Sequence, residues 1–139
     1  MKTTSKRQKK STAMIIIMLM FILASCGGGA QQRVQEERLK EVKENTTLQL
    51  QQLRNDIDNR LEYLDEQIEK ASGELEEQLK EVRAELKKQR DVVEKEMEGV
   101  RAASLDTWDQ VITSVNKHYQ EVRGKTNEVS KKVREMLDD

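Results

Sequence analysis

The sequence predicts an all-α protein whose main element is a long, nearly straight amphipathic helix or coiled coil. Of the 139 residues, 37% are charged, 35% are hydrophobic and 3% are aromatic, a balance typical of long helices rather than of globular cores. The chain contains no proline, and apolar residues recur at helical spacing from about residue 31 to residue 137. These observations exclude sandwiches, barrels, Rossmann folds and disulfide scaffolds. The length allows one domain at most.

The first 25 residues have the pattern of a secretory signal peptide. Residues 1–12 carry five basic side chains and no acidic one, and a run of 12 apolar residues follows at positions 13–24. A helix that spans a bilayer needs about 20 apolar residues, so this run is too short for one. A basic start followed by a short apolar core and small residues is typical of a signal peptide, and a short membrane anchor is the alternative.

The four residues that end this segment carry a family resemblance. Leu23-Ala24-Ser25-Cys26 resembles the lipobox of bacterial lipoproteins at all four positions. The resemblance implies that the Cys26 sulfur carries a diacylglyceryl group and that lipoprotein signal peptidase cleaves between Ser25 and Cys26. A further N-acyl chain such as palmitate can follow on the new amino terminus. Cys26 is the only cysteine, so no disulfide can form within the chain, and a free thiol or an intermolecular disulfide is the alternative.

The resemblance also implies a division of the chain and a location. Residues 1–25 are removed, residues 26–30 form the lipidated cysteine and a glycine-rich tether, and residues 31–139 form the helical body. Two or three acyl chains hold a protein stably on a membrane. Gly27 stands where proteobacterial inner-membrane lipoproteins have Asp. We therefore expect an envelope protein on the outer membrane facing the periplasm, or on the outer face of the plasma membrane in a cell with one membrane.

The helical body shows an eleven-residue repeat. Apolar or aromatic residues stand eleven apart at Val42, Leu53, Leu64, Leu75, Leu86, Met97, Trp108 and Tyr119. Eleven residues make three turns at about 3.67 residues per turn, which predicts a straight or slightly right-handed coiled coil. The predicted coiled-coil seam consists of Leu53, Ile57, Leu61, Leu64, Ile68, Leu75, Leu79, Val82, Leu86, Val93, Met97, Trp108, Val111, Val115 and Tyr119.

Signals that would interrupt this helix are few. Gly73 lies inside an unbroken apolar row, so we expect it to stay helical. A bend is expected at residues 99–106, where the seam thins and Ser104 offers an N-cap, and Thr107 with Gln110 matches a capping box. Two arrangements remain open. One is a single helix of about 100 residues and about 150 Å that associates with copies of itself, which we favour, and the other is a hairpin or small bundle.

The polar faces predict a solvated helix without catalytic chemistry. Acid-then-base pairs four residues apart are expected to stabilise the exposed helix. They are Glu36–Lys40, Glu66–Lys70, Glu76–Lys80, Asp91–Lys95 and Glu128–Lys132. His118 is the only histidine, so neither a metal site nor a catalytic set is expected, and we predict no enzyme activity, no cofactor and no small-molecule substrate. Residues 13–139 carry 20 basic and 26 acidic side chains, a net charge of −6. Their sequence shows no basic face interleaved with aromatic residues, which argues against nucleic-acid binding.

The expected function is therefore structural. A lipid-anchored coiled coil of the cell envelope would act as a tether, spacer or docking rod, pairing with copies of itself, with a partner helix or with another envelope protein. The chain is similar to the small helical lipoproteins that link outer membrane to cell wall. It ends Leu137-Asp138-Asp139, however, without the terminal lysine of the murein-linked type. The alternative is an amphipathic lipid-binding helix, because exchangeable apolipoproteins also have eleven-residue repeats.

Overall fold

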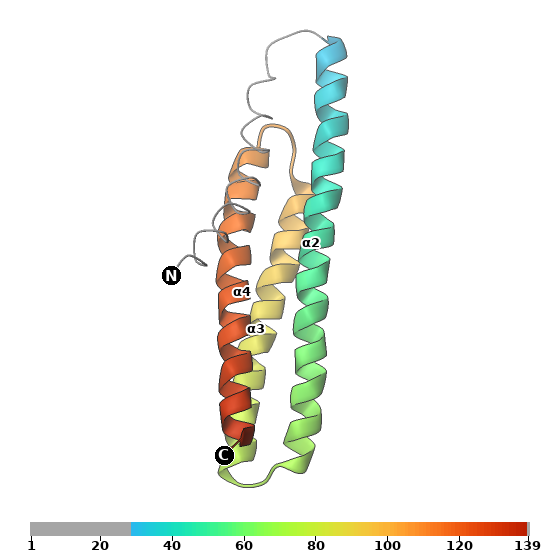
Figure 1. Ribbon diagram of the computed structural model, residues 1–139. Coiled ribbons are helices and arrows are strands. Elements are labelled where there is room, and N and C mark those ends of the chain that lie inside the picture. Colours follow the sequence, from blue (N-terminus) through green and yellow to red (C-terminus); the bar gives the residue numbers. More distant parts are fainter. Residues whose placement is uncertain (1–28, 139) are drawn as a thin grey trace, which may run out of the picture. The chain divides into compact units, whose positions relative to one another are not determined.

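The computed structural model describes residues 29–138, and this part of the chain is all-helical, as the composition predicts. The helices are α2 (Gly29–Lys70, 42 residues), α3 (Glu74–Ala102, 29 residues) and α4 (Trp108–Asp138, 31 residues), with no strand among the described residues (Figure 1). Residues Glu41–Asp139 form one compact unit, and the chain up to Lys40 belongs to another. The larger unit contains most of α2 and all of α3 and α4.

The chain of this unit reverses twice, so the expectation of one continuous helix is wrong. Near the start of the unit, Lys43 on α2 bonds to main-chain oxygens at the end of α3. Near the end of α2, Asp65 pairs with Arg83 in the first half of α3. Helices α2 and α3 are therefore antiparallel, and α4 returns along α3 (Figure 1). From residue 41 onward the three helices form a bundle about 44 Å long, estimated from the length of α3.

The first reversal occurs at Gly73, which we expected to be helical. Helix α2 ends at Lys70 and Gly73 adopts φ 65° and ψ −135°, and it is the only described residue with a positive φ. Glycine enters this region without the steric cost that a Cβ brings. The apolar spacing on both sides of Gly73 is helical, but an isolated amphipathic helix gains little until its apolar face is covered. Folding back covers that face within one chain.

The second reversal confirms the predicted bend and places it late in the predicted range. Helix α3 ends at Ala102 and α4 begins at Trp108, while Gly99 remains helical. The Thr107 hydroxyl accepts a hydrogen bond from the Ser104 N–H at 3.0 Å, and the Thr107 N–H donates to the Ser104 carbonyl at 3.3 Å. These two residues close the turn on each other. The Thr107 carbonyl then accepts the first bond of α4 at 3.0 Å, from Val111.

The buried residues of each helix follow steps of three and four, which is heptad spacing. In α4 they are Trp108, Ile112, Val115, Val122, Thr126, Val129 and Val133. In α3 they are Leu79, Val82, Leu86, Gln89, Val93, Met97 and Val100. In α4 the steps of four, three and four from Val122 to Val133 span eleven residues within a heptad row. In α3 the eleven residues from Leu86 to Met97 contain steps of three, four and four, which is a stutter in the heptad spacing. The eleven-residue line does not run along one continuous face, because the two turns interrupt it.

Candidate functional site: lipidation segment and interhelical contacts

The predicted lipidation and cleavage site lies outside the described residues. Ser25, Cys26 and the signal segment before them all precede Gly29, where α2 begins. The last glycine of the expected tether is thus the first residue of a helix. No helix of the described chain is long and apolar enough to cross a membrane.

The residues of the predicted coiled-coil seam lie in or beside the core of the bundle. Ten are buried: Leu53, Ile57, Leu64, Leu79, Val82, Leu86, Val93, Met97, Trp108 and Val115. Five are half-buried: Leu61, Ile68, Leu75, Val111 and Tyr119. The seam side chains thus meet side chains of the same chain, whereas the continuous helix would have presented them to a second molecule.

Several core residues were not part of the predicted seam. In α4 the structure buries Ile112 and leaves its neighbour Val111 half-exposed, and it buries Thr126 with 1% exposure. The row that starts at Trp108 and continues in alternating steps of four and three residues includes Ile112 and Thr126. The sequence could therefore have identified both residues as buried. In α2, Leu50 is 1% exposed and belongs to the same row as Leu53.

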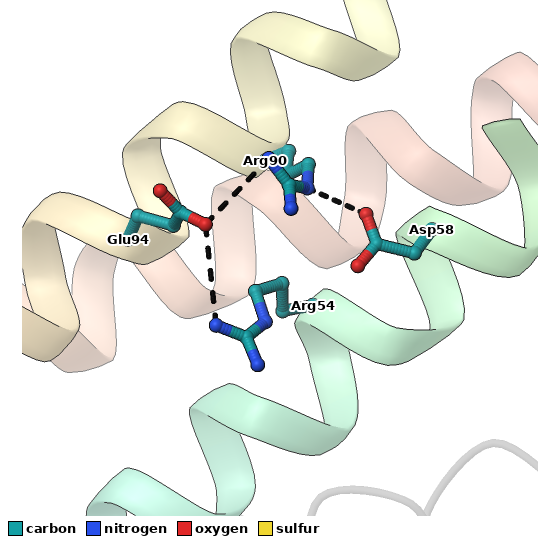
Figure 2. A network of polar contacts seen from close by, with 4 residues as sticks. All are labelled: Arg54, Asp58, Arg90 and Glu94. Atoms are coloured by element: carbon teal, nitrogen blue, oxygen red, sulfur yellow. Dashed lines mark hydrogen bonds and ion pairs between the residues drawn. The ribbon is translucent and has the colours of Figure 1, made fainter.

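A four-residue ionic network joins α2 to α3 (Figure 2). Arg90 on α3 donates from Nε to Asp58 on α2 at 2.5 Å, and its Nη1 lies 3.6 Å from Glu94. Glu94 in turn lies 3.9 Å from Arg54 on α2. The hydrogen bond to Asp58, followed by Coulombic attraction to the same carboxylate, raises the pKa of Arg90 above its already high ordinary value. The guanidinium therefore stays charged at any physiological pH.

Two more polar contacts join α2 to α3, one an ion pair and the other a lysine bound to main-chain carbonyls. Asp65 and Arg83 pair one heptad closer to the turn than Asp58 and Arg90 do. At the far end, the Lys43 ammonium donates to the carbonyls of Arg101 at 2.9 Å and Ala103 at 2.8 Å, where α3 exposes carbonyls without a partner in the helix. A cation at a helix C-terminus is also favoured by the helix dipole. All of these contacts belong to one antiparallel register of α2 and α3.

The lone histidine lies between α3 and α4. His118 Nδ1 bonds to Glu96, and the same nitrogen lies 3.3 Å from the Ser114 hydroxyl. A nucleophile–base–acid relay needs the serine and the carboxylate on opposite ring nitrogens. Here both contact Nδ1, so this trio does not have the geometry of a catalytic triad. Among the described residues, no group of three or more potential ligands could hold a metal ion.

A cavity of about 300 Å³ lies near the C-terminal end of α4. Its lining includes Leu64 and Leu86 from α2 and α3, Val129 from α4, and the arginines Arg60 and Arg134. The Arg60 guanidinium already forms an ion pair, because its Nη2 lies 3.2 Å from the Asp56 carboxylate. The lining is therefore mixed in polarity and selects no single class of ligand.

Comparison with protein-family models, with curated proteins and with solved structures finds no match for this chain.

Proposed function

We propose that this protein is a lipid-anchored helical lipoprotein of the bacterial cell envelope, in which Cys26 is the anchor and the helical bundle is a structural or docking module. The observation that carries the proposal is the order of a basic start, a 12-residue apolar core and Leu23-Ala24-Ser25-Cys26. A thiolate is the nucleophile required to form the thioether to the lipid. No other cysteine competes for this modification.

The properties of the bundle are consistent with a tether, spacer or docking role. Its helices bury their apolar rows against one another, and the interface is held in register by ion pairs. A bundle with such a core is suited to a structural or docking role. We place it on the outer membrane facing the periplasm in a cell with two membranes, because Gly27 and not Asp follows Cys26.

The lipid-binding alternative is less well supported. A helix that lies on a membrane presents a continuous apolar face to lipid. In the described part of the bundle the large exposed hydrophobic residues are Leu48, 55% exposed, and Tyr63, 48% exposed. These two side chains are separated along α2 and do not make such a face. We therefore propose anchoring through Cys26 and not through the surface of the bundle.

The test is metabolic labelling of the full chain in bacteria with an alkyne analogue of palmitate. The wild-type chain is expected to incorporate the label, to fractionate with the outer membrane and to migrate as the shortened mature form. Cys26→Ala removes the sulfur, so label, cleavage before residue 26 and stable membrane association should be lost together.

The matched control is Ser25→Ala, which changes the neighbouring residue but keeps it small. This variant should be labelled and processed as the wild type is. If wild-type protein takes up no label, or if Cys26→Ala is cleaved and anchored normally, the proposal is wrong.

A further inference from the structure

The turn between α2 and α3 interrupts a row of side chains that is otherwise suited to one continuous helix. The row steps by four, three, four and four through Leu64, Ile68, Ala71, Leu75 and Leu79. The backbone is close to helical on both sides. The Ala71 N–H donates to the Gln67 carbonyl at 3.0 Å, and the Glu77 N–H donates to the Gly73 carbonyl at 3.4 Å, both with four-residue spacing. The interruption is thus confined to residues 71–73.

Gly73 is the residue that permits this interruption. Its φ of 65° is a conformation that L side chains rarely adopt, and a Cβ placed there would meet no atom within 4 Å. A side chain at position 73 is therefore disfavoured by the backbone conformation and not by a clash with neighbouring atoms. No side chain caps the first turn of α3 at Gly73, so no capping bond is lost if the turn straightens.

The α2–α3 contacts have a register that a second molecule can reproduce. Asp58 pairs with Arg90, and Asp65 pairs with Arg83, with matching seven-residue steps on two antiparallel helices. If the turn straightens, two continuous helices from two copies can lie antiparallel and form the same pairs between chains. The half-buried Ile68 and Leu75, at the edge of the core in one chain, would then lie near the middle of the paired helices.

We propose that this protein forms an exchanged dimer with a second copy of the same chain. Residues 71–73 become helical, α2 from residue 41 joins α3 in one helix, and α2 of each copy packs on α3 and α4 of the other. The interface is the one already present within the single chain, so no new surface is required. Short turns under conformational constraint favour this kind of exchange. The inference is independent of lipidation at Cys26.

The test uses charge reversal in two differently tagged full chains expressed together. One chain carries Asp58→Arg and the other carries Arg90→Asp, so that each has like charges facing one another within its own bundle. In an exchanged mixed dimer, the arginine introduced at position 58 of one chain meets the aspartate introduced at position 90 of the other. The native Asp58 likewise meets the native Arg90. Both ionic pairs are restored at once.

The ratio of mixed dimers to dimers of like chains is expected to be about tenfold above its statistical value, which corresponds to about 1.4 kcal/mol. The control is a pair of tagged chains that each carry both reversals. Every such chain restores the pair internally and between copies, so its dimers should mix statistically. If dimers of the single variants also mix statistically, or if no dimer forms at high concentration, the exchange is refuted. Association of intact bundles through an outer surface would give that statistical result.

Gly73→Ala provides an independent measurement in the same tagged system. Alanine disfavours the turn and favours the helix, so the dimer-to-monomer ratio should rise about thirtyfold. Gly99→Ala is the matched control, because Gly99 is helical and has equally open space around its Cβ. An unchanged ratio in Gly73→Ala, or an equal rise in Gly99→Ala, would contradict the hinge role of Gly73. If Gly73→Ala fails to fold, the charge-reversal pair in the native Gly73 background still decides the question.

Discussion

Replacing Thr126 by Val is expected to stabilise the bundle. Thr126 is 1% exposed, and its hydroxyl oxygen has no hydrogen-bond partner among the described residues. The Thr126 carbonyl does have partners, the Ser130 hydroxyl at 3.0 Å and the Arg60 guanidinium at 3.4 Å, but these bonds are to the main chain and survive the change. Val has nearly the same shape as Thr and a similar helix propensity. The substitution therefore removes one desolvated hydroxyl and little else.

The size of the expected gain in the free energy of unfolding follows from the missing hydrogen bond of the Thr126 hydroxyl. A buried hydroxyl without a partner costs about 1–3 kcal/mol. A gain of about 1–2 kcal/mol in the free energy of unfolding would raise the Tm by about 5–10 °C for a unit of this size. The assay is urea and thermal unfolding of the full chain, followed by circular dichroism at the helical band.

Two control substitutions separate this explanation from others. Thr126→Ser keeps the hydroxyl and removes a buried methyl group, so it should destabilise by about 1 kcal/mol. Thr113→Val alters an exposed threonine whose hydroxyl already donates to the Asp109 carbonyl at 2.8 Å, and it should change stability by about 0.5 kcal/mol or less. If Thr126→Val lowers the Tm as Thr126→Ser does, the hydroxyl has a partner in solution and the reasoning fails.

Three further outcomes are expected from the same unfolding assay. Gly99→Ala should stabilise by up to about 1 kcal/mol, because a helical glycine with open space gains from a methyl group, and a loss would show that the position is crowded. Leu86→Ala should cost about 3–4 kcal/mol because Leu86 is fully buried, whereas Leu48→Ala, at an exposed position, should cost little, and equal losses would contradict the core. Lys43→Met should cost about 1–2 kcal/mol through the two lost bonds at the end of α3, and unchanged unfolding would mean that solvent satisfies those carbonyls equally well.

The all-helical fold could be predicted from the sequence because its signals are local. The absence of proline and the apolar steps of three and four residues are features of a few helical turns. They predict a helix equally well whether that helix stands alone or lies in a bundle. The turn at Ser104 and Thr107 could also be predicted from the sequence, because polar side chains there bond to the backbone or to each other. Local polar side chains mark a helix end directly.

The turn at Gly73 could not be predicted in the same way. One glycine in an apolar row costs a helix only about 1 kcal/mol, so the local signal favoured continuity. The reversal is decided by contacts between residues far apart, such as Asp58 with Arg90 and Lys43 with the end of α3. Of the pairs predicted four residues apart, Glu76 and Lys80 do pair at 3.0 Å, but such a pair forms on any exposed helix and reveals nothing about where the chain turns.

The number of helices determines the ends of the bundle at which the chain enters and leaves. A chain that crosses a bundle an odd number of times enters at one end and leaves at the other, whereas two or four crossings would return it to its starting side. The unit begins at Glu41 at one end of the bundle, and α4 ends at Asp138 at the opposite end. The end of α4 lies at the same end of the bundle as the α2–α3 turn (Figure 1). A fluorophore attached at Asp138 would lie about 44 Å from one attached at Glu41, the length of a helix of this size. The two ends of the bundle are thus chemically distinct and can be labelled separately.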